Sequence, residues 1–295
     1  MTEFTKVHRL KDVLFHKFTA VIKQKHPIGV FDSGYGGLTI LKEIVAHLPQ
    51  YDYVYLGDNA RAPYGSRSYE SVYHYTLECV NLLFDKGCEL VILACNTASA
   101  KALRTIQQRD LPKIAPHKRV LGVIRPTSEI IGSLSENGHV GILGTTGTVN
   151  SGSYLLEIEK FYPELRVSQE ACPMWVPLIE NNQVNNPGSD YFIELHTKAL
   201  LKKDPQIDTI VLACTHYPLI VNAIKKFIPN HVQLVAQGPL IAHGLHDYLL
   251  RHPEMETLCT RNGEVEFYTT DNPEFFDEPA SRFYGQSIQS KHIHL

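Results

Sequence analysis

The chain has 295 residues and is 43% hydrophobic, which is enough for one large domain or two ordinary ones. Its 28 basic and 31 acidic residues give no basic field that would attract nucleic acid, and no apolar run approaches the roughly 20 residues of a membrane helix. Six cysteines, mostly inside apolar runs, do not form a disulfide framework, and no signal-peptide core is visible. We therefore expect a cytoplasmic protein without nucleic-acid or membrane partners.

Residues 1–26 precede the first predicted strand and are interpreted as an N-terminal extension. Leu10, Val13, Leu14 and Phe18 fall near helical spacing, so a short amphipathic helix is predicted there. The strand 27–31 then runs into a glycine-rich turn, 32–37, before a helix over 38–47. This turn lacks the lysine and hydroxyl pair of a phosphate-binding loop, and it would suit a carboxylate as well as a phosphate.

A second strand is predicted over 51–56, and a helix follows over 68–86. Residues 89–94 form the next strand. It ends at Cys95 and is followed by a helix that begins near Thr97. A cysteine at such a strand-to-helix turn is expected to have a lowered pKa and to be reactive. Cys79 and Cys88, which lie within apolar surroundings, are interpreted as structural.

The cysteine-bearing strand occurs twice. Residues 91–97 read Val-Ile-Leu-Ala-Cys-Asn-Thr, and residues 210–216 read Ile-Val-Leu-Ala-Cys-Thr-His. An unalternating apolar run of this length indicates a strand covered on both faces, as in a parallel α/β sheet. Ligands of such sheets lie beyond the carboxyl ends of the strands, where both cysteines fall. We therefore expect Cys95 and Cys214 to face each other across one site.

A strand with a following glycine and hydroxyl turn also occurs twice, at 28–34 and at 139–148, each at a similar distance before its cysteine. This spacing indicates two half-chains that share one plan. The second half is completed by helices at 151–161 and 191–203 and strands at 167–171 and 232–236. Residues 181–189 are predicted to be a mobile loop, and Cys172 is interpreted as structural. A last strand is predicted over 265–270, followed by a polar tail.

Two opposed thiols can act as base and acid on the two faces of one carbon, which inverts a stereocentre without net change. Ser33, Asn96, Thr97 and Thr215 could hold carboxylate and ammonium groups by hydrogen bonds. Asp32 could balance the ammonium or assist Cys95, and His216 could tune Cys214. The residues leave four alternatives open, namely a redox dithiol, a zinc site, a Cys-His hydrolase and a non-catalytic module with buried cysteines.

Several motifs together resemble glutamate racemases of the aspartate/glutamate racemase family. They span about residues 27–244 in order and spacing, and they comprise Gly29 to Thr39, Gly57 to Gly65, Cys95 to Ser99, Gly144 to Thr148, Cys172 to Glu180, and Cys214 to Pro218. The resemblance implies interconversion of L- and D-glutamate for peptidoglycan synthesis without a cofactor or metal. It also implies two pseudo-symmetric, doubly wound α/β domains with mainly parallel sheets and a site in the cleft between them. The expected first domain comprises 27–122 and 235–295, and the second comprises 123–234.

By the same resemblance, Cys95 and Cys214 are the two acid/base residues, assisted by Asp32, His216 and Glu180. The expected substrate contacts are Asp32, Ser33, Tyr64, Gly65, Asn96, Thr97, Thr145, Thr148, Thr215 and His216. A homodimer and activation by a cell-wall precursor are the partners that this family suggests beside glutamate. One departure is Asn59, where the family usually has threonine. Aspartate or hydantoin racemisation, and a binding module without turnover, remain as alternatives.

Overall fold

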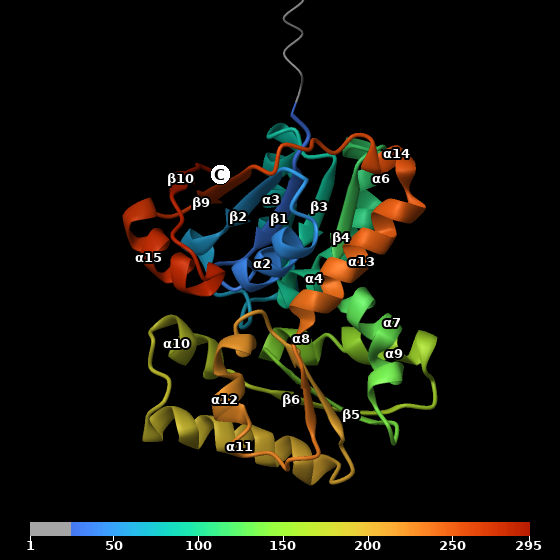
Figure 1. The fold of residues 1–295 in the computed structure, drawn as a ribbon, viewed down its shortest axis with the longest axis vertical. Coiled ribbons are helices and arrows are strands. Elements are labelled where there is room, and N and C mark those ends of the chain that lie inside the picture. Colours follow the sequence, from blue (N-terminus) through green and yellow to red (C-terminus); the bar gives the residue numbers. More distant parts are fainter. Residues whose placement is uncertain (1–24) are drawn as a thin grey trace, which may run out of the picture.

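Two all-parallel β-sheets, each flanked by helices, occupy the upper and lower halves of the molecule in the view of Figure 1. The computed structural model describes residues 25–295, so most of the predicted N-terminal extension, including its amphipathic helix, lies outside the described residues. The predicted fold class is confirmed, because both sheets are parallel and both alternate with helices along the chain. The domain boundaries at 122 and 234 remain a prediction.

The upper half contains a six-stranded sheet in the order β10-β9-β2-β1-β3-β4. Its strands are β1 (Ile28–Asp32), β2 (Tyr53–Gly57), β3 (Leu90–Leu93), β4 (Arg119–Gly122), β9 (Val265–Thr269) and β10 (Ser290–His292). Every residue of β1, β2 and β3 is buried, as the unalternating apolar sequence of these strands predicts.

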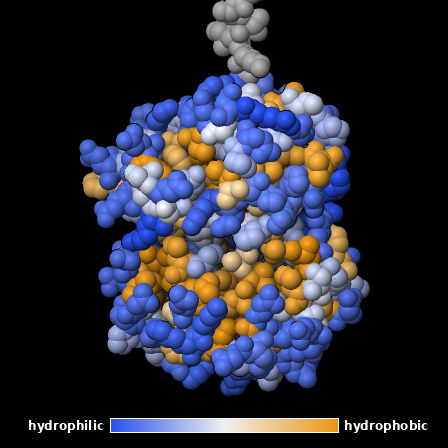
Figure 2. Space-filling model, in the orientation of Figure 1, coloured by the Kyte–Doolittle hydropathy of each residue, from blue (hydrophilic) through white to orange (hydrophobic). Residues whose placement is uncertain are grey.

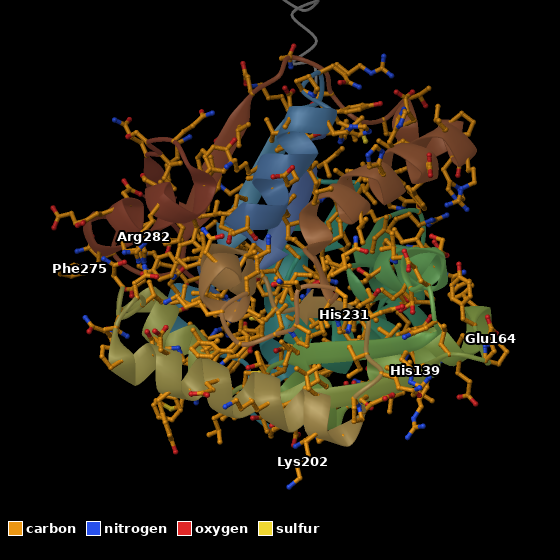
Figure 3. The ribbon with its side chains drawn as sticks, turned by 60° about the horizontal axis from the view of Figure 1, so that its bottom comes forward. His139, Glu164, Lys202, His231, Phe275 and Arg282 are labelled. Carbon is orange, nitrogen blue, oxygen red and sulfur yellow. The ribbon has the colours of Figure 1, made fainter. Side chains whose placement is uncertain are left out.

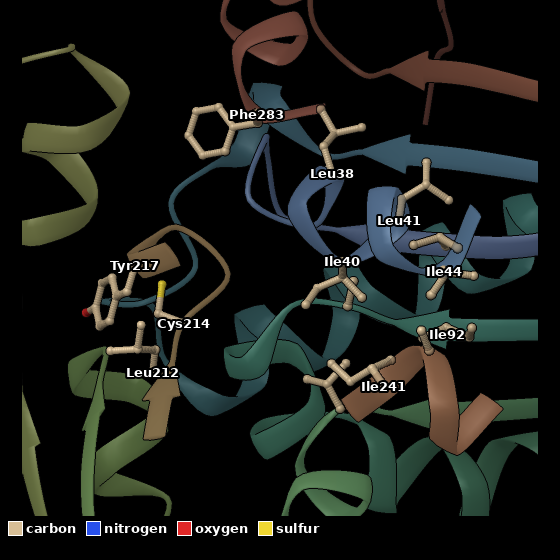
Figure 4. Close-up of a cluster of buried hydrophobic side chains, with 14 of the residues drawn as sticks. Leu38, Ile40, Leu41, Ile44, Ile92, Leu212, Cys214, Tyr217, Ile241 and Phe283 are labelled. Atoms are coloured by element: carbon tan, nitrogen blue, oxygen red, sulfur yellow. The ribbon is translucent and has the colours of Figure 1, made fainter. Parts of the chain in front are cut away.

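The helical segments of this half are α2 (Leu38–His47), η1 (Asn59–Arg61), α3 (Tyr69–Asp85), α4 (Asn96–Lys101), α5 (Leu103–Thr105), η2 (Ile106–Asp110), α6 (Leu111–Ile114), α13 (Gln237–Arg251), α14 (Pro253–Glu256) and α15 (Pro273–Tyr284). The start of α3 is set by Ser68, whose side chain accepts a hydrogen bond from the Ser71 amide. Helix α2 packs along α13, and their apolar faces form part of the core drawn in Figure 4, which includes Leu41, Ile44 and Ile241.

The lower half contains a four-stranded sheet in the order β6-β5-β7-β8. Its strands are β5 (His139–Gly144), β6 (Arg166–Ala171), β7 (Thr209–Ala213) and β8 (Gln233–Val235). Its helical segments are α7 (Ile124–Leu134), α8 (Thr146–Asn150), α9 (Ser153–Phe161), α10 (Trp175–Glu180), α11 (Pro187–Lys203), η3 (Tyr217–Ile220) and α12 (Val221–Ile224). On the face drawn in Figure 2, hydrophobic residues gather mainly over this half.

The two halves repeat one plan, as the sequence predicted. The order β6-β5-β7-β8 matches the order β2-β1-β3-β4 of the first sheet. The strand registers also match, since Gly29 pairs with Val91 on the first cysteine strand and Gly141 pairs with Ile210 on the second. Both partner residues stand at the same distance before their cysteine. Cys95 and Cys214 therefore occupy equivalent positions at the carboxyl ends of β3 and β7.

The prediction of a polar C-terminal tail is wrong. Residues 273–284 form α15, whose first turn is capped by Asn272 and whose inner face buries Phe276, Ala280 and Phe283. Strand β10 then adds to the sheet edge beside β9. The charged residues between these aromatic positions hid the pattern, because an amphipathic helix with a narrow apolar stripe has a polar average composition.

One further prediction needs correction. Helix α11 begins at Pro187, within the segment predicted to be a mobile loop, because Asn186 and Ser189 form reciprocal capping hydrogen bonds and proline suits a first helical turn. Within residues 25–295, none of the helices has the length and apolar character needed to cross a membrane.

Candidate active site

A cavity of about 150 Å³ lies where the carboxyl ends of both sheets converge, and both Cys95 and Cys214 line it. A cavity of this size holds a small molecule; an engineered cavity of similar volume takes up benzene. The predicted site residues that line it are Ser33, Tyr64, Gly65, Cys95, Asn96, Thr97, Thr145, Glu180, Cys214, Thr215 and His216. Both thiols therefore border the same cavity, and their roles in a site remain a prediction.

Two predicted site residues, Asp32 and Thr148, lie behind the cavity wall. Thr148 is fully buried, and its hydroxyl lies 3.0 Å from that of Thr145 and 3.4 Å from that of Thr97. The Thr97 and Thr145 hydroxyls are themselves 2.9 Å apart. This cluster joins α4 of the upper half to the start of α8 in the lower half. Thr148 can thus orient the two hydroxyls that face the cavity.

Cys95 caps the start of α4. Its sulfur accepts a hydrogen bond from the Ala98 amide at 3.4 Å and donates one to Ser33 Oγ at 3.5 Å. Burial, together with the nearby charge of Asp32, raises the pKa of the Cys95 thiol to about 12 despite these two contacts. The sequence-based expectation of a lowered pKa is therefore wrong, because desolvation of the thiolate outweighs the effect of a short helix.

Asp32 ends β1 and is almost completely buried. The Gly34 amide donates to its Oδ2 at 3.0 Å, whereas its Oδ1 has no hydrogen-bond partner among residues 25–295. Burial raises the pKa of this carboxyl group, and the positive charge of His216 acts against that effect. An orphaned carboxylate oxygen at this depth is costly unless a ligand, a water molecule or a proton satisfies it.

On the opposite side, Cys214, His216 and Glu180 form a chain. The Cys214 sulfur lies 3.8 Å from His216 Nδ1, and His216 Nε2 lies 2.9 Å from Glu180 Oε1. Figure 4 shows Cys214 beside Leu212 and Tyr217 at the end of β7. Burial alone would lower the pKa of His216, but the hydrogen bonds with Cys214 and Glu180 outweigh it and raise that pKa to about 10. The raised pKa favours the protonated, positively charged form of His216.

Several contacts hold the two halves together around the cavity. The Thr39 hydroxyl donates to the Thr215 carbonyl at 2.8 Å, and the Gly147 amide donates to the Gly65 carbonyl at 2.8 Å. Arg282, which projects from α15 in Figure 3, donates to the carbonyl of Glu180 at 3.1 Å. Tyr64 borders the cavity, but its hydroxyl is engaged by Asp58. Its predicted substrate contact can therefore come from its ring rather than from a free hydroxyl.

The cavity also has walls that were not predicted as site residues, namely Ala62, Pro63, Ser66, Thr146, Cys172, Pro173, Val176 and Pro177. Cys172 was interpreted as structural; it packs in the core and also borders the cavity. Val176 and Pro177 come from α10, which supplies Glu180 as well. The walls within residues 172–180 could have been found from the run Cys172 to Glu180, which already formed part of the family resemblance.

The structure bears on one alternative left open by the sequence, the zinc site. All six cysteines are free and buried. Among residues 25–295, no group of three or more histidine, cysteine, aspartate or glutamate side chains is placed to hold a metal ion. The zinc-site alternative thus lacks a ligand set in the part of the chain that the structure describes.

Comparison with known proteins agrees with this geometry. The family model for Asp/Glu/Hydantoin racemase matches residues 28–242. A glutamate racemase from Geobacter metallireducens is 38% identical over 88% of this chain and 93% of its own length. Among solved structures, a glutamate racemase from Bacillus anthracis superimposes with a TM-score of 0.83 at 32% identity, covering 92% of this chain and 98% of its own.

Two further structures were solved with ligands. A glutamate racemase from Francisella tularensis in complex with D-glutamate has a TM-score of 0.80 at 32% identity, with 92% of this chain and 98% of its own covered. One from Escherichia coli, in complex with L-glutamate and the activator UDP-MurNAc-Ala, has a TM-score of 0.67 at 27% identity, with coverage of 88% and 95%. The extent of these matches over both halves leads to one conclusion: the chain belongs to the Asp/Glu/hydantoin racemase family.

Proposed function

We propose that the protein interconverts L- and D-glutamate by a two-base reaction at Cys95 and Cys214, and so supplies D-glutamate for peptidoglycan synthesis. The observation that carries this proposal is the pairing of two thiols from equivalent strand ends around one small cavity. Racemisation needs one group on each face of the α-carbon. A repeated half-structure supplies such a pair, whereas a hydrolase or a binding module would need no second thiol.

In this mechanism, one sulfur removes the α-proton as a thiolate, and the other donates a proton to the opposite face as a thiol. Reversal of the roles runs the reaction in the other direction. The two sides differ in charge. Asp32 lies near Cys95, whereas the His216 cation lies beside Cys214 and is held by Glu180. A thiolate at Cys95, once formed, is a strong base because its conjugate acid has a pKa of about 12.

The cavity offers hydroxyl donors for the carboxylate oxygens of glutamate, and a carboxylate lies behind its wall. The hydroxyls of Ser33, Thr97, Thr145 and Thr215 border the cavity and can donate to carboxylate oxygens. The unpaired Oδ1 of Asp32 lies behind the cavity wall, so this carboxylate is the candidate to assist Cys95 and can balance the charge of the substrate ammonium group without touching it. None of the described lining residues is a lysine, so no Schiff-base partner for a pyridoxal cofactor borders this cavity.

The test uses the full chain, pure L-glutamate and no added cofactor, with circular dichroism to follow loss of optical activity. We expect the wild type to approach an optically inactive mixture, and we expect Cys95→Ala and Cys214→Ala each to abolish turnover. Cys79→Ala is the matched control, because Cys79 is equally buried but lies on α3 outside the cavity. Full turnover by either of the first two variants would rule out the two-base scheme.

The same assay separates the alternatives within the family. Racemisation of aspartate or a hydantoin in preference to glutamate would redirect the proposal to those substrates, and binding without turnover would favour a binding module. Activation by a cell-wall precursor, like that named for the Escherichia coli relative, is tested by adding UDP-MurNAc-Ala to the assay. The predicted homodimer is tested by sedimentation equilibrium.

A further inference from the structure

A buried hydrogen-bond network behind Asn96 joins the two halves of the molecule. The Tyr154 hydroxyl donates to Asn96 Oδ1 at 2.6 Å, and Asn96 Nδ2 donates to Gln237 Oε1 at 2.7 Å. Gln237 Nε2 closes the ring by donating to the Tyr154 hydroxyl at 2.7 Å. All three side chains are at most 3% exposed. They come from α4, α9 and α13, so the network spans elements far apart in the sequence.

The end of the network away from Asn96, at Val123 and Thr127, determines which group donates in each hydrogen bond. One hydrogen of Gln237 Nε2 is used on Tyr154, and the other is shared between the Val123 carbonyl at 3.3 Å and Thr127 Oγ1 at 2.8 Å. The Thr127 hydroxyl donates to the same carbonyl at 3.0 Å. A carbonyl oxygen can only accept hydrogen bonds, so Gln237 must present its NH₂ group to this end and its oxygen to Asn96.

The same logic then determines the orientation of Asn96. Its NH₂ group must face the Gln237 oxygen, and its own oxygen must face Tyr154. The Tyr154 hydroxyl accepts from Gln237 and is therefore free to donate to Asn96 Oδ1. A flip of the Asn96 amide is disfavoured, because it would place the Asn96 and Gln237 oxygens against each other and would remove the acceptor of the Tyr154 hydroxyl.

An amide NH₂ group has two hydrogens, and Gln237 takes only one of those on Asn96. Among residues 25–295, the other N–H has no acceptor, while Asn96 borders the cavity and directly follows Cys95. We propose that Tyr154 and Gln237 are positioning residues, which hold the Asn96 amide so that this N–H is presented to a carboxylate oxygen of the substrate. The inference rests on the proposed function for the identity of that carboxylate.

The chemistry explains why such an arrangement is useful. A flipped Asn96 would turn its oxygen, a partial negative charge, toward an anionic substrate. A network of neutral groups that ends at a backbone carbonyl prevents this without placing another charge near Cys95. Neither Tyr154 nor Gln237 borders the cavity, so the lining residues alone would not reveal this role.

The experiment is a double-mutant cycle of Tyr154→Phe and Asn96→Ala. We measure KM for glutamate by circular dichroism, Kd for D-glutamate by isothermal titration calorimetry, and Tm for each variant. Tyr154→Phe should raise KM and Kd about tenfold, as expected when a hydrogen bond to a charged group is weakened by about 1.4 kcal/mol. In the Asn96→Ala background the same substitution should change them less than about twofold, because the amide to be positioned is absent.

Tyr53→Phe is the matched control. Tyr53 is equally buried, and its hydroxyl donates to the Leu48 carbonyl at 2.7 Å. It is the first residue of β2, and neither Tyr53 nor Leu48 lines the cavity. It should lower Tm without changing KM or Kd. Gln237→Met removes the acceptor for Asn96 without adding charge. It should also raise KM and Kd about tenfold, and it replaces Tyr154→Phe in the cycle if Tyr154→Phe does not fold.

Equal effects of Tyr154→Phe in the two backgrounds, or a loss of Tm with unchanged KM and Kd, would overturn the inference and leave the network a structural role only. The binding measurement separates this result from the fate of the proposed function. A wild type that binds D-glutamate without racemising it would refute the proposed function, yet the coupling between Tyr154 and Asn96 would still be measured in Kd.

Discussion

Gly36 offers a sharp test of how closely the two halves must approach. A methyl group at this position would lie 2.1 Å from Thr215 Oγ1 and 2.5 Å from His216 Nδ1. Gly34, two residues earlier in the same turn, has room for a methyl group, since its nearest neighbour, Asn59 Nδ2, would be 3.6 Å away. Neither glycine has a positive φ, so alanine strains the backbone at neither position.

The size of the effect follows from these distances. To restore ordinary contacts of 3.4 Å, Thr215 Oγ1 must retreat by about 1.3 Å and His216 Nδ1 by about 0.9 Å. His216 cannot move freely, because it is buried and bonded to Glu180 at 2.9 Å. The Thr39 hydroxyl also holds the Gly36 and Thr215 carbonyls together, at 2.9 Å and 2.8 Å. The clash is therefore relieved by displacing His216 from Cys214 or by holding the halves apart.

A displacement of about 1 Å in catalytic groups can reduce turnover about a hundredfold, so Gly36→Ala should lower kcat/KM for glutamate by about that factor. Overpacking should reduce the free energy of unfolding by about 1–3 kcal/mol at most. Gly34→Ala should keep kcat/KM within about threefold of the wild type, by the same geometric argument. The assay is circular dichroism in both reaction directions, with Tm as the measure of folding. Wild-type turnover in Gly36→Ala, or an equal loss in Gly34→Ala, would refute the reasoning.

Three further predictions concern single contacts. Glu180→Gln should lower the pKa of His216 from about 10, because one of the two groups that hold its charge is lost. Since the raised pKa stabilises the fold fully below pH 6.5 and this contribution is lost as the pH rises through about 10, the Tm deficit of the variant should be larger at about pH 6 than at neutral pH and should narrow toward pH 10. Asn186→Ala removes the cap of α11 and should reduce the free energy of unfolding by about 1 kcal/mol, measured in urea, with kcat unchanged. Trp175→Ala should destabilise the lower half by about 3–5 kcal/mol, measured by the same titration, because the fully buried ring packs edge-on against Tyr217 at 4.8 Å.

Much of the fold could be predicted from local patterns. The strands around Val91 and Ile210 were evident because a buried parallel strand needs an unbroken apolar run, and both runs end at the predicted cysteine. The C-terminal helix was missed because its three buried positions are separated by charged residues. Its identity as a helix depends on packing against the upper half, which no local window contains.

The residues proposed for the site could be named from the sequence, whereas their electrostatics could not. Most expected residues line the cavity, including Glu180, whose position at the end of an apolar run left its role open until the family resemblance was considered. The pKa of Cys95 was predicted in the wrong direction. Its position at a helix start is a local feature, whereas its burial and its nearness to Asp32 depend on the folded chain.

The sequence by itself determined that two apolar strands end in cysteines within two similar half-chains, because strand character and repetition are properties of neighbouring residues. Only the tertiary structure decided that both thiols border one cavity, that Asp32 keeps an unpaired oxygen, and that Tyr154 and Gln237 orient Asn96. These features join residues far apart in the chain. Their energies depend on burial and on distances of a few ångströms, and both arise only when the two halves pack against each other.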